Sequence, residues 1–338
     1  MRIDIVCFSD AGAALAKRLR SSFNASDIFI HATEKLARQY GFEAHKSLGA
    51  CMEKLFPVAD ALIFIGAAGI AVRAIAPFVT SKTTDPAVVV MDDQAQFAIS
   101  LLSGHIGGAN ALAGEIAAAT GAQAVITTAT DVSGRFACDS WATAHGCTIS
   151  SMSLAKKVSA AILAGEIPLA SEYPLPAALP NGLIAAREGT IGIYIGVRTQ
   201  EPFAATLRLI PRIVTLGIGC RRGTPPEAIL EAITTTLAAQ QIDMRAICAI
   251  ASIDVKKDEA GLLAAAAQLQ VPTRFYSAEE LLAVPGTFEE SAFVREQVGV
   301  GNVCERAALC SGGSLVIPKT AAGGVTVAAA VKEWSIVF

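Results

Sequence analysis

The chain has few aromatic and few charged residues: Phe, Trp and Tyr make up 6% of its 338 residues, and Asp, Glu, Lys and Arg make up 17%. A formal net charge of −3 excludes the strongly basic surface that nucleic-acid binding requires. The apolar window over residues 61–72 is too short to span a bilayer and is bounded by Asp60 and Arg73. The first residues resemble a strand rather than a secretion signal, so we expect a cytoplasmic protein with no membrane partner.

Paired cysteine motifs are also missing. None of the eight cysteines shows C-x-x-C spacing, which argues against a zinc site or a thioredoxin-like motif. We therefore expect reduced thiols, most of which pack as small hydrophobic residues.

What the chain does contain is aliphatic residues in a regular pattern. Apolar residues make up 53% of the sequence, and short Val, Ile, Leu and Ala runs alternate with helical segments. This alternation predicts an α/β fold whose N-terminal domain has a doubly wound, mostly parallel sheet. A turn-rich stretch and then a second α/β pattern follow. We predict an N-terminal α/β domain over residues 1–136, a middle linking module over 137–208 and a C-terminal α/β domain over 209–338.

Several local patterns predict individual elements. Apolar runs predict buried strands over 61–65 and 87–91, and a helix is expected over 105–119. Segments 183–186 and 191–197 are expected to form a hairpin. Thr224 and Ser277 each stand three residues before a glutamate, the spacing of a helix capping box.

The segment around His105 has more glycine than a fold requires, because Gly104, Gly107 and Gly108 crowd around one imidazole. A neutral imidazole near a helix N-terminus can act as a general base. The N–H groups of Gly104 and Gly107 can bind a carboxylate or an oxyanion. The alternative is a structural histidine that bonds to nearby backbone, and the sequence leaves both open.

Other candidates follow predicted strands, where open α/β sheets bind ligands. Asp92 and Asp93 are either solvated residues at a strand end or carboxylates that orient His105. Glu305 either covers a helix face or acts as an acid. Cys220 stands at a helix entry with no histidine near it in sequence, and we interpret it as a lining residue more readily than as a nucleophile.

A dinucleotide site is disfavoured. Residues 217–223 read G-x-G-x-x-x-G, which is one residue too long for the Rossmann fingerprint, and the acidic residue expected for ribose is missing from the next strand.

Two sets of motifs resemble one known family. Residues 64–77 (FIGAAGIAVRAIAP), 85–92 (DPAVVVMD) and 101–110 (LLSGHIGGAN) are similar to the N-terminal signature of the cobalt-precorrin-5A hydrolases of anaerobic cobalamin synthesis. The C-terminal domain of that family resembles residues 216–224 (LGIGCRRGT), 254–259 (DVKKDE), 273–281 (TRFYSAEEL), 319–320 (KT) and 325–328 (VTVA). The resemblance covers nearly the whole chain.

The resemblance implies a hydrolase that opens the ring A acetate δ-lactone of cobalt-precorrin-5A, releases acetaldehyde and gives cobalt-precorrin-5B. Cobalt would arrive in the substrate, so no protein cofactor or metal site is expected. Neighbouring methyltransferases of the pathway and a second copy of the chain are candidate partners. The alternative is a non-catalytic carrier of corrinoid intermediates, because the C-terminal domain of the family also occurs as a free-standing protein.

The candidate site residues fall into two groups. Lactone opening needs a base and an acid, for which we select His105, Asp93 and Glu305. A polycarboxylate macrocycle needs cations and close backbone approach. For binding we select Gly66, Gly69, Arg73, Asp92, Ser103, Gly104, Gly107, Gly108, Gly219, Cys220, Arg221, Gly223, Asp254, Lys256, Lys257, Ser277 and Lys319.

Overall fold

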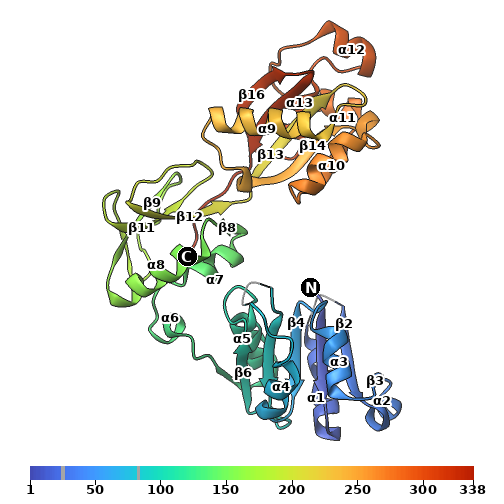
Figure 1. Ribbon diagram of the computed structural model, residues 1–338, viewed down its shortest axis with the longest axis vertical. Coiled ribbons are helices and arrows are strands. Elements are labelled where there is room, and N and C mark those ends of the chain that lie inside the picture. Colours follow the sequence, from blue (N-terminus) through green and yellow to red (C-terminus); the bar gives the residue numbers. More distant parts are fainter. Residues whose placement is uncertain (24–26, 82–83) are drawn as a thin grey trace. The chain divides into compact units, whose positions relative to one another are not determined.

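The computed structural model describes residues 1–23, 27–81 and 84–338. The chain divides into two compact units, Met1–Thr143 and Ala144–Phe338. Figure 1 shows the first unit in blue to green and the second in green to red. The division between the units falls near the first predicted domain boundary. The second unit contains two separate sheets, which lie in the predicted middle module and the predicted C-terminal domain. The division of this unit into two domains stays a prediction.

The first unit is built on a seven-stranded sheet of order β3-β2-β1-β4-β5-β6-β7. Neighbouring strands are parallel except for β5 and β6. The strands are β1 (Ile3–Cys7), β2 (Ile28–Thr33), β3 (Glu43–His45), β4 (Ala61–Ile65), β5 (Ala87–Met91), β6 (Phe97–Leu102) and β7 (Gln123–Val125). Every residue of β1, β4 and β5 is buried, as expected for apolar strands covered on both faces.

Helices cover both faces of this sheet. They are α1 (Asp10–Ser22), α2 (Glu34–Tyr40), α3 (Leu48–Leu55), α4 (Ala68–Ile75) and α5 (Ala109–Thr120). Two further helices, α6 (Ala129–Val132) and α7 (Cys138–Ala144), follow β7 along the chain. One core contains side chains of α1, α2 and α5, and the other contains those of α3 and α4. Because each face of the sheet has its own core, the doubly wound α/β class predicted from the sequence is confirmed.

The hairpin of β5 and β6 corrects the predicted course of the chain. The sequence predicted a helix from residue 105 that follows β5 without a further strand. Instead β6 runs back along β5, with Met91 opposite Ala98 and Val88 opposite Leu102. The helix α5 begins only at Ala109, after Gly108 with φ 87°.

The second unit begins with a five-stranded sheet of order β10-β9-β11-β12-β8. Its elements are β8 (Cys147–Ile149), α8 (Met152–Ala164), β9 (Ile167–Ser171), β10 (Leu183–Ala185), β11 (Ile191–Ile195) and β12 (Ala205–Pro211). The hairpin predicted for 183–186 and 191–197 is wrong, because β10 and β11 lie on opposite sides of β9 and both run parallel to it. The turn residues between them connect strands that do not pair.

The second sheet of this unit has the order β15-β14-β13-β17-β16, and only β16 and β17 form a hairpin. Its strands are β13 (Val214–Cys220), β14 (Ile247–Ile253), β15 (Thr273–Tyr276), β16 (Ser314–Ala322) and β17 (Val325–Val331). Its helices are α9 (Pro226–Ala239), η1 (Met244–Ala246), η2 (Asp254–Lys256), α10 (Ala260–Gln268), α11 (Ala278–Ala283), α12 (Ala292–Val298) and α13 (Val303–Cys310). Side chains of α9 and α10 fill one core, and those of α11 and α13 fill another.

Two local predictions in this sheet have different outcomes. Ser277 forms the predicted capping box with Glu280 at the start of α11. The capping box predicted at Thr224 is wrong, because Pro225 occupies the N-cap of α9 and the Thr224 hydroxyl donates to the Arg221 carbonyl at 2.8 Å. The Thr224 side chain therefore closes the preceding loop instead of capping the helix.

Gly217, in the middle of β13, permits close helix packing. A Cβ at this position would overlap the carbonyl oxygen of Cys304 on α13. The glycine that belonged to the disfavoured dinucleotide pattern is therefore required where a helix crosses the strand.

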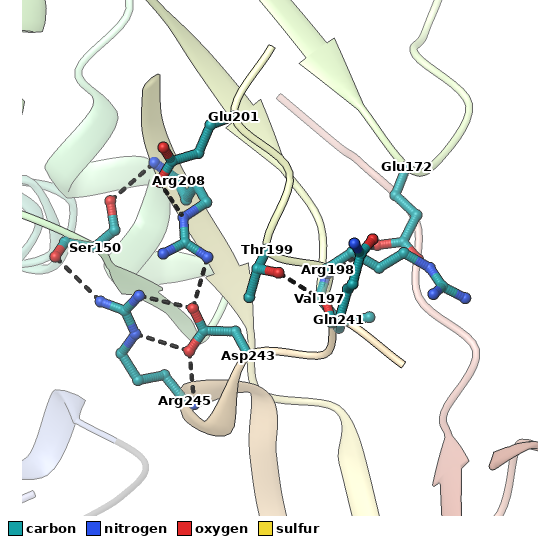
Figure 2. Close-up of polar contacts among 10 residues, drawn as sticks. All are labelled: Ser150, Glu172, Val197, Arg198, Thr199, Glu201, Arg208, Gln241, Asp243 and Arg245. Carbon is teal, nitrogen blue, oxygen red and sulfur yellow. Dashed lines mark hydrogen bonds and ion pairs between the residues drawn. The ribbon is translucent and has the colours of Figure 1, made fainter. Parts of the chain in front are cut away.

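Charged side chains join the two sheets of the second unit (Figure 2). Asp243 is buried and accepts hydrogen bonds from Arg208 of β12 at 2.8 Å and from Arg245 of η1 at 2.7 Å. Arg245 also donates to the Ser150 carbonyl at 3.1 Å. Burial would raise the pKa of Asp243, but the bonds from Arg245 and the charge of Arg208 outweigh it and lower that pKa. Asp243 is thus held as a carboxylate between two guanidinium groups.

No helix among the described residues is long and apolar enough to cross a membrane. Of the eight cysteines, Cys7, Cys51, Cys138 and Cys304 are buried. Burial raises the pKa of the Cys7 and Cys51 thiols to about 11, which agrees with thiols that pack as small hydrophobic groups.

We predict that Asp243→Ala destabilises the second unit by about 3 kcal/mol, because it leaves two guanidinium groups without their shared carboxylate. Urea denaturation followed by circular dichroism measures the change. Asp258→Ala, at an exposed position, is the matched control and should change stability by less than about 0.5 kcal/mol. Equal stability of the two variants would contradict the structural role of Asp243.

Candidate active site

The turn between β6 and α5 carries the glycine-rich segment around His105, and its glycines are needed by the turn itself. A Cβ on Gly104 would lie 2.7 Å from the Asn110 side-chain oxygen, and a Cβ on Gly107 would overlap the Cβ of Ser103. The N–H groups of Ala109 and Asn110 bond back to the carbonyls of Ser103 and Gly104. The inference that this glycine content exceeds what the fold requires is therefore wrong, because a turn folded this tightly excludes side chains.

His105 is paired with a carboxylate that the sequence did not single out. Its Nδ1 lies 3.2 Å from Oδ2 of Asp139 on α7, and the two side chains are 14% and 10% exposed. Because a carboxylate only accepts hydrogen bonds, Nδ1 of the neutral imidazole carries the proton. Nε2 is then the nitrogen that can accept a proton as a base. The structure thus places an oriented imidazole–carboxylate pair in a largely buried position.

Polar side chains connect this turn to the neighbouring strand. Asn110 accepts a hydrogen bond from Ser100 of β6 at 2.6 Å and donates one to Thr128 after β7 at 2.9 Å. The Ser103 hydroxyl donates to the carbonyl of Asp85, just before β5, at 3.0 Å. These bonds fix the turn against three segments of the sheet, which keeps His105 in one position.

The antiparallel direction of β6 decides on which edge of the sheet His105 lies. Leu102 is opposite Val88, at the beginning of β5, whereas Asp92 follows the end of that strand. Val88 and Asp92 are four residues apart along the strand direction, which corresponds to about 13 Å. His105 therefore lies away from Gly66 and Asp92, which are at the carboxyl edge.

Asp92 and Asp93 form structural hydrogen bonds at the carboxyl edge of the sheet. The Asp92 carboxylate accepts the backbone N–H groups of Gln94, Gln96 and Phe97, which closes the turn into β6. Burial would raise the pKa of Asp92, but these bonds outweigh it and lower that pKa. Asp93 accepts a hydrogen bond at 3.2 Å from Ser9, the N-cap of α1. The hypothesis that either aspartate orients His105 is wrong, because Asp139 occupies that position.

The carboxyl edge of the first sheet holds an open groove that the sequence did not reveal. The groove has a volume of about 800 Å³ and is lined from the ends of β1, β2 and β3 and the starts of α2 and α3. A second groove of about 550 Å³, lined by Arg73, shares Leu48 and Ile70 with it. Of the residues predicted to bind substrate, Gly66, Gly69 and Arg73 follow β4 at this edge.

His45 lines the larger groove. Both ring nitrogens are covered and make no hydrogen bond with any residue that the structure describes. Burial and, after it, the charge of nearby His31 lower the pKa of His45. The imidazole is therefore neutral at pH 7.

The predicted binding residues of the last sheet gather along one edge, because β13, β14 and β15 are parallel and β17 starts beside the end of β13. This edge comprises Gly219, Cys220, Arg221, Gly223, Asp254, Lys256, Lys257 and Ser277, and Lys319 lies on β16 a few residues before that edge. Lys256 is paired with Glu259 at 3.1 Å, and Glu259 also accepts the Gly223 N–H at 2.7 Å. Glu259 thus holds the loop at Gly223.

Two further candidates on this sheet have a defined environment. Burial raises the pKa of Cys220, and the charge of Lys256 opposes that rise only in part, which supports its interpretation as a lining thiol. Glu305 on α13 is buried and accepts hydrogen bonds from the Asn302 side chain and from the Lys319 N–H, the latter at 2.8 Å. Its carboxylate thus connects α13 to β16.

Among the residues that the structure describes, no three His, Cys, Asp or Glu side chains come together as a group that can hold a metal ion.

Comparisons with known proteins identify similar chains over nearly the full length. The family models "Cobalamin synthesis G N-terminal" and "Cobalamin synthesis G C-terminus" match residues 50–131 and 214–330. Cobalt-precorrin-5A hydrolase of Salmonella typhimurium is 37% identical over 96% of each chain. Cobalt-precorrin-5A hydrolase of Priestia megaterium is 31% identical over 96% of this chain and 94% of its own. A solved cobalamin biosynthesis protein G homolog of Sulfolobus solfataricus is 22% identical over 98% of this chain and 97% of its own, with a TM-score of 0.40.

Gly107→Ala is expected to destabilise the first unit by roughly 1–3 kcal/mol, because the added Cβ forces apart the turn that holds His105. Gly114→Ala is the matched control on α5, where a Cβ meets no atom within 4 Å. That change should stabilise the unit by about 1 kcal/mol, since alanine favours a helix interior. Urea denaturation of both variants measures the difference, and a neutral Gly107→Ala would contradict the packing of the turn.

The lowered pKa of His45 predicts how stability depends on pH. The unfolded chain binds a proton on this imidazole below about pH 6.5, whereas the folded chain does not until lower pH, so stability falls as the pH falls. His45→Phe should therefore lose less stability than the wild type between about pH 7.5 and 5.5. Denaturation midpoints at several pH values measure the two slopes, and identical slopes would show that His45 is not buried in its neutral form.

Proposed function

The chain belongs to the cobalamin synthesis G family, and on that premise we propose that it hydrolyses cobalt-precorrin-5A. It is a hydrolase of cobalamin biosynthesis, and the alternative of a non-catalytic carrier is not favoured. The reaction we propose is the opening of the ring A acetate δ-lactone by water, with release of acetaldehyde and formation of cobalt-precorrin-5B. Cobalt belongs to the substrate in this proposal.

The His105–Asp139 pair is the observation that carries the proposed chemistry. Water attacks the lactone carbonyl efficiently only when a base removes its proton, and a neutral imidazole suits that task near pH 7. The Asp139 carboxylate, 3.2 Å from Nδ1, holds the tautomer that directs Nε2 to the water, and it stabilises the imidazolium that then forms. His105 is thus the proposed general base, and Asp139 is its positioning residue.

Other residues are proposed to bind the substrate or to act as acids. The carboxylates of the substrate need cations, and Arg221, Arg222 and Lys257 supply exposed positive charge at the edge of the last sheet. Asp93 and Glu305 stay predictions as acids, and the bonds described above give each of them a structural role as well. The cytoplasmic location, the methyltransferase partners and the dimer stay predictions.

Anaerobic incubation with cobalt-precorrin-5A, followed by trapping of the volatile aldehyde, tests the reaction and the base. His105→Ala should lower kcat by roughly 10²–10⁴-fold, because the general base is lost. Asp139→Asn should also lower kcat and should change the pH profile, since an amide can hold the wrong tautomer.

Glu115→Gln is the matched control, because it removes one carboxylate charge from an exposed position on α5. We expect it to change kcat by less than about ten-fold, which is smaller than the loss of a general base. Full turnover of His105→Ala would contradict the base assignment, and absence of acetaldehyde from the wild type would contradict the reaction.

A further inference from the structure

The groove at the carboxyl edge of the first sheet combines positive charge with an apolar floor. Lys35 and Arg38 on α2 and Lys46 before α3 are exposed cations that line it, and Glu34 is the one acidic residue among its lining side chains. Glu34 lies 3.9 Å from Arg38, and both side chains are largely exposed. The charge of Glu34 offsets that of Arg38, so the groove keeps a net positive charge from its two lysines.

The floor of the groove is made of apolar side chains. Phe8, Leu48 and Ile70 line it, and Ile70 is 38% exposed. The adjoining groove shares Leu48 and Ile70 and is also lined by Phe78, Arg73 and the acidic Glu53. The apolar strip thus has three cations near one end, and a fourth cation and one acidic residue near the other.

This arrangement fits a particular class of ligand. A small anion needs only one or two donors and gains nothing from an apolar strip. A large flat ring with carboxylates around its edge places its face on the strip and its carboxylates on cations at both ends. Pockets for such ligands occur beyond the carboxyl ends of strands, near the point where strand order reverses, and this groove begins at that place beside β1.

The groove is far from the His105–Asp139 pair within the same unit. The pair lies at the amino edge of β5, and the groove lies at the carboxyl edge, three or more strands away from β6. Strand rise and strand spacing put the two on the order of 20 Å apart.

We propose that the groove is a second binding site, separate from the His105–Asp139 pair, for a tetrapyrrole that carries several carboxylates. The identity of the ring rests on the proposed function, whereas the preference for a carboxylate-bearing ring rests on the groove. Lys35 and Lys46 bind the carboxylates, and Phe8, Leu48 and Ile70 contact the ring. His45 adds no charge to the site at pH 7, because burial lowers its pKa.

Lysine protection in the intact chain tests the position of the site. Cobyrinic acid, a cobalt corrin with free carboxylates around its ring, is the probe, and reductive methylation read by mass spectrometry reports each lysine. We expect the probe to protect Lys35 and Lys46 and to leave Lys54, an exposed residue near the end of α3, unprotected. Equal methylation of Lys35 and Lys46 with and without the probe would overturn the proposal.

Affinity measurements with matched variants test the charges. Lys35→Gln with Lys46→Gln should weaken cobyrinic acid binding by about ten-fold, and the difference should shrink at high salt. Lys54→Gln with Lys157→Gln removes the same charge from exposed positions outside the groove and should bind as the wild type does. Equal affinities of the two double variants would overturn the role of the groove lysines.

Failure of this proposal is distinguishable from failure of the proposed function. A chain that releases acetaldehyde from cobalt-precorrin-5A but shows no protection of Lys35 and Lys46 refutes the groove alone. A chain that shows the protection but releases no acetaldehyde refutes the hydrolysis alone.

Discussion

The hydrogen bonds from the backbone of Gln94, Gln96 and Phe97 to the Asp92 carboxylate are the interaction on which the candidate site depends. They close the turn that sends β6 back along β5. Because β6 is antiparallel, its end and the His105 turn lie at the amino edge of the parallel strands. A parallel strand in the same place would have put His105 beside Gly66 and Asp92. The Asp92 carboxylate therefore determines which residues surround the imidazole.

This reversal gives the first sheet two edges with different chemistry. At the amino edge, α7 supplies Asp139 to His105, and the polar bonds of Asn110 hold the turn. At the carboxyl edge, cations surround an open apolar groove. The first edge suits proton transfer, because a buried carboxylate orients the imidazole. The second suits recognition of a charged ring, because its exposed cations can adjust to the carboxylates of a ligand.

Carboxylates in the second unit serve the fold more than they serve chemistry. Asp243 joins two arginines between its sheets, Glu259 holds the loop at Gly223, and Glu305 connects α13 to β16. Each is an acidic side chain whose oxygens are occupied by N–H donors. Basic side chains at the edge of the last sheet are by contrast exposed, with Lys256 the paired exception. That edge therefore exposes the cations Arg221, Arg222 and Lys257 together with the acidic Asp254 and Asp258.

Periodicity and composition were sufficient to predict the α/β class and the buried strands β4 and β5, because these depend on local apolar patterns. The motifs around Gly66, His105 and Cys220 were likewise sufficient to indicate the family. Strand direction, the Asp139 partner and the cationic groove required the tertiary structure. Asp139 is 34 residues from His105, and the groove is lined by residues from Phe8 to Ile70, so no local pattern encodes either. The sequence by itself determined which residues are available to the chemistry, and only long-range strand pairing decided which of them meet, because pairing sets the edge at which each loop emerges.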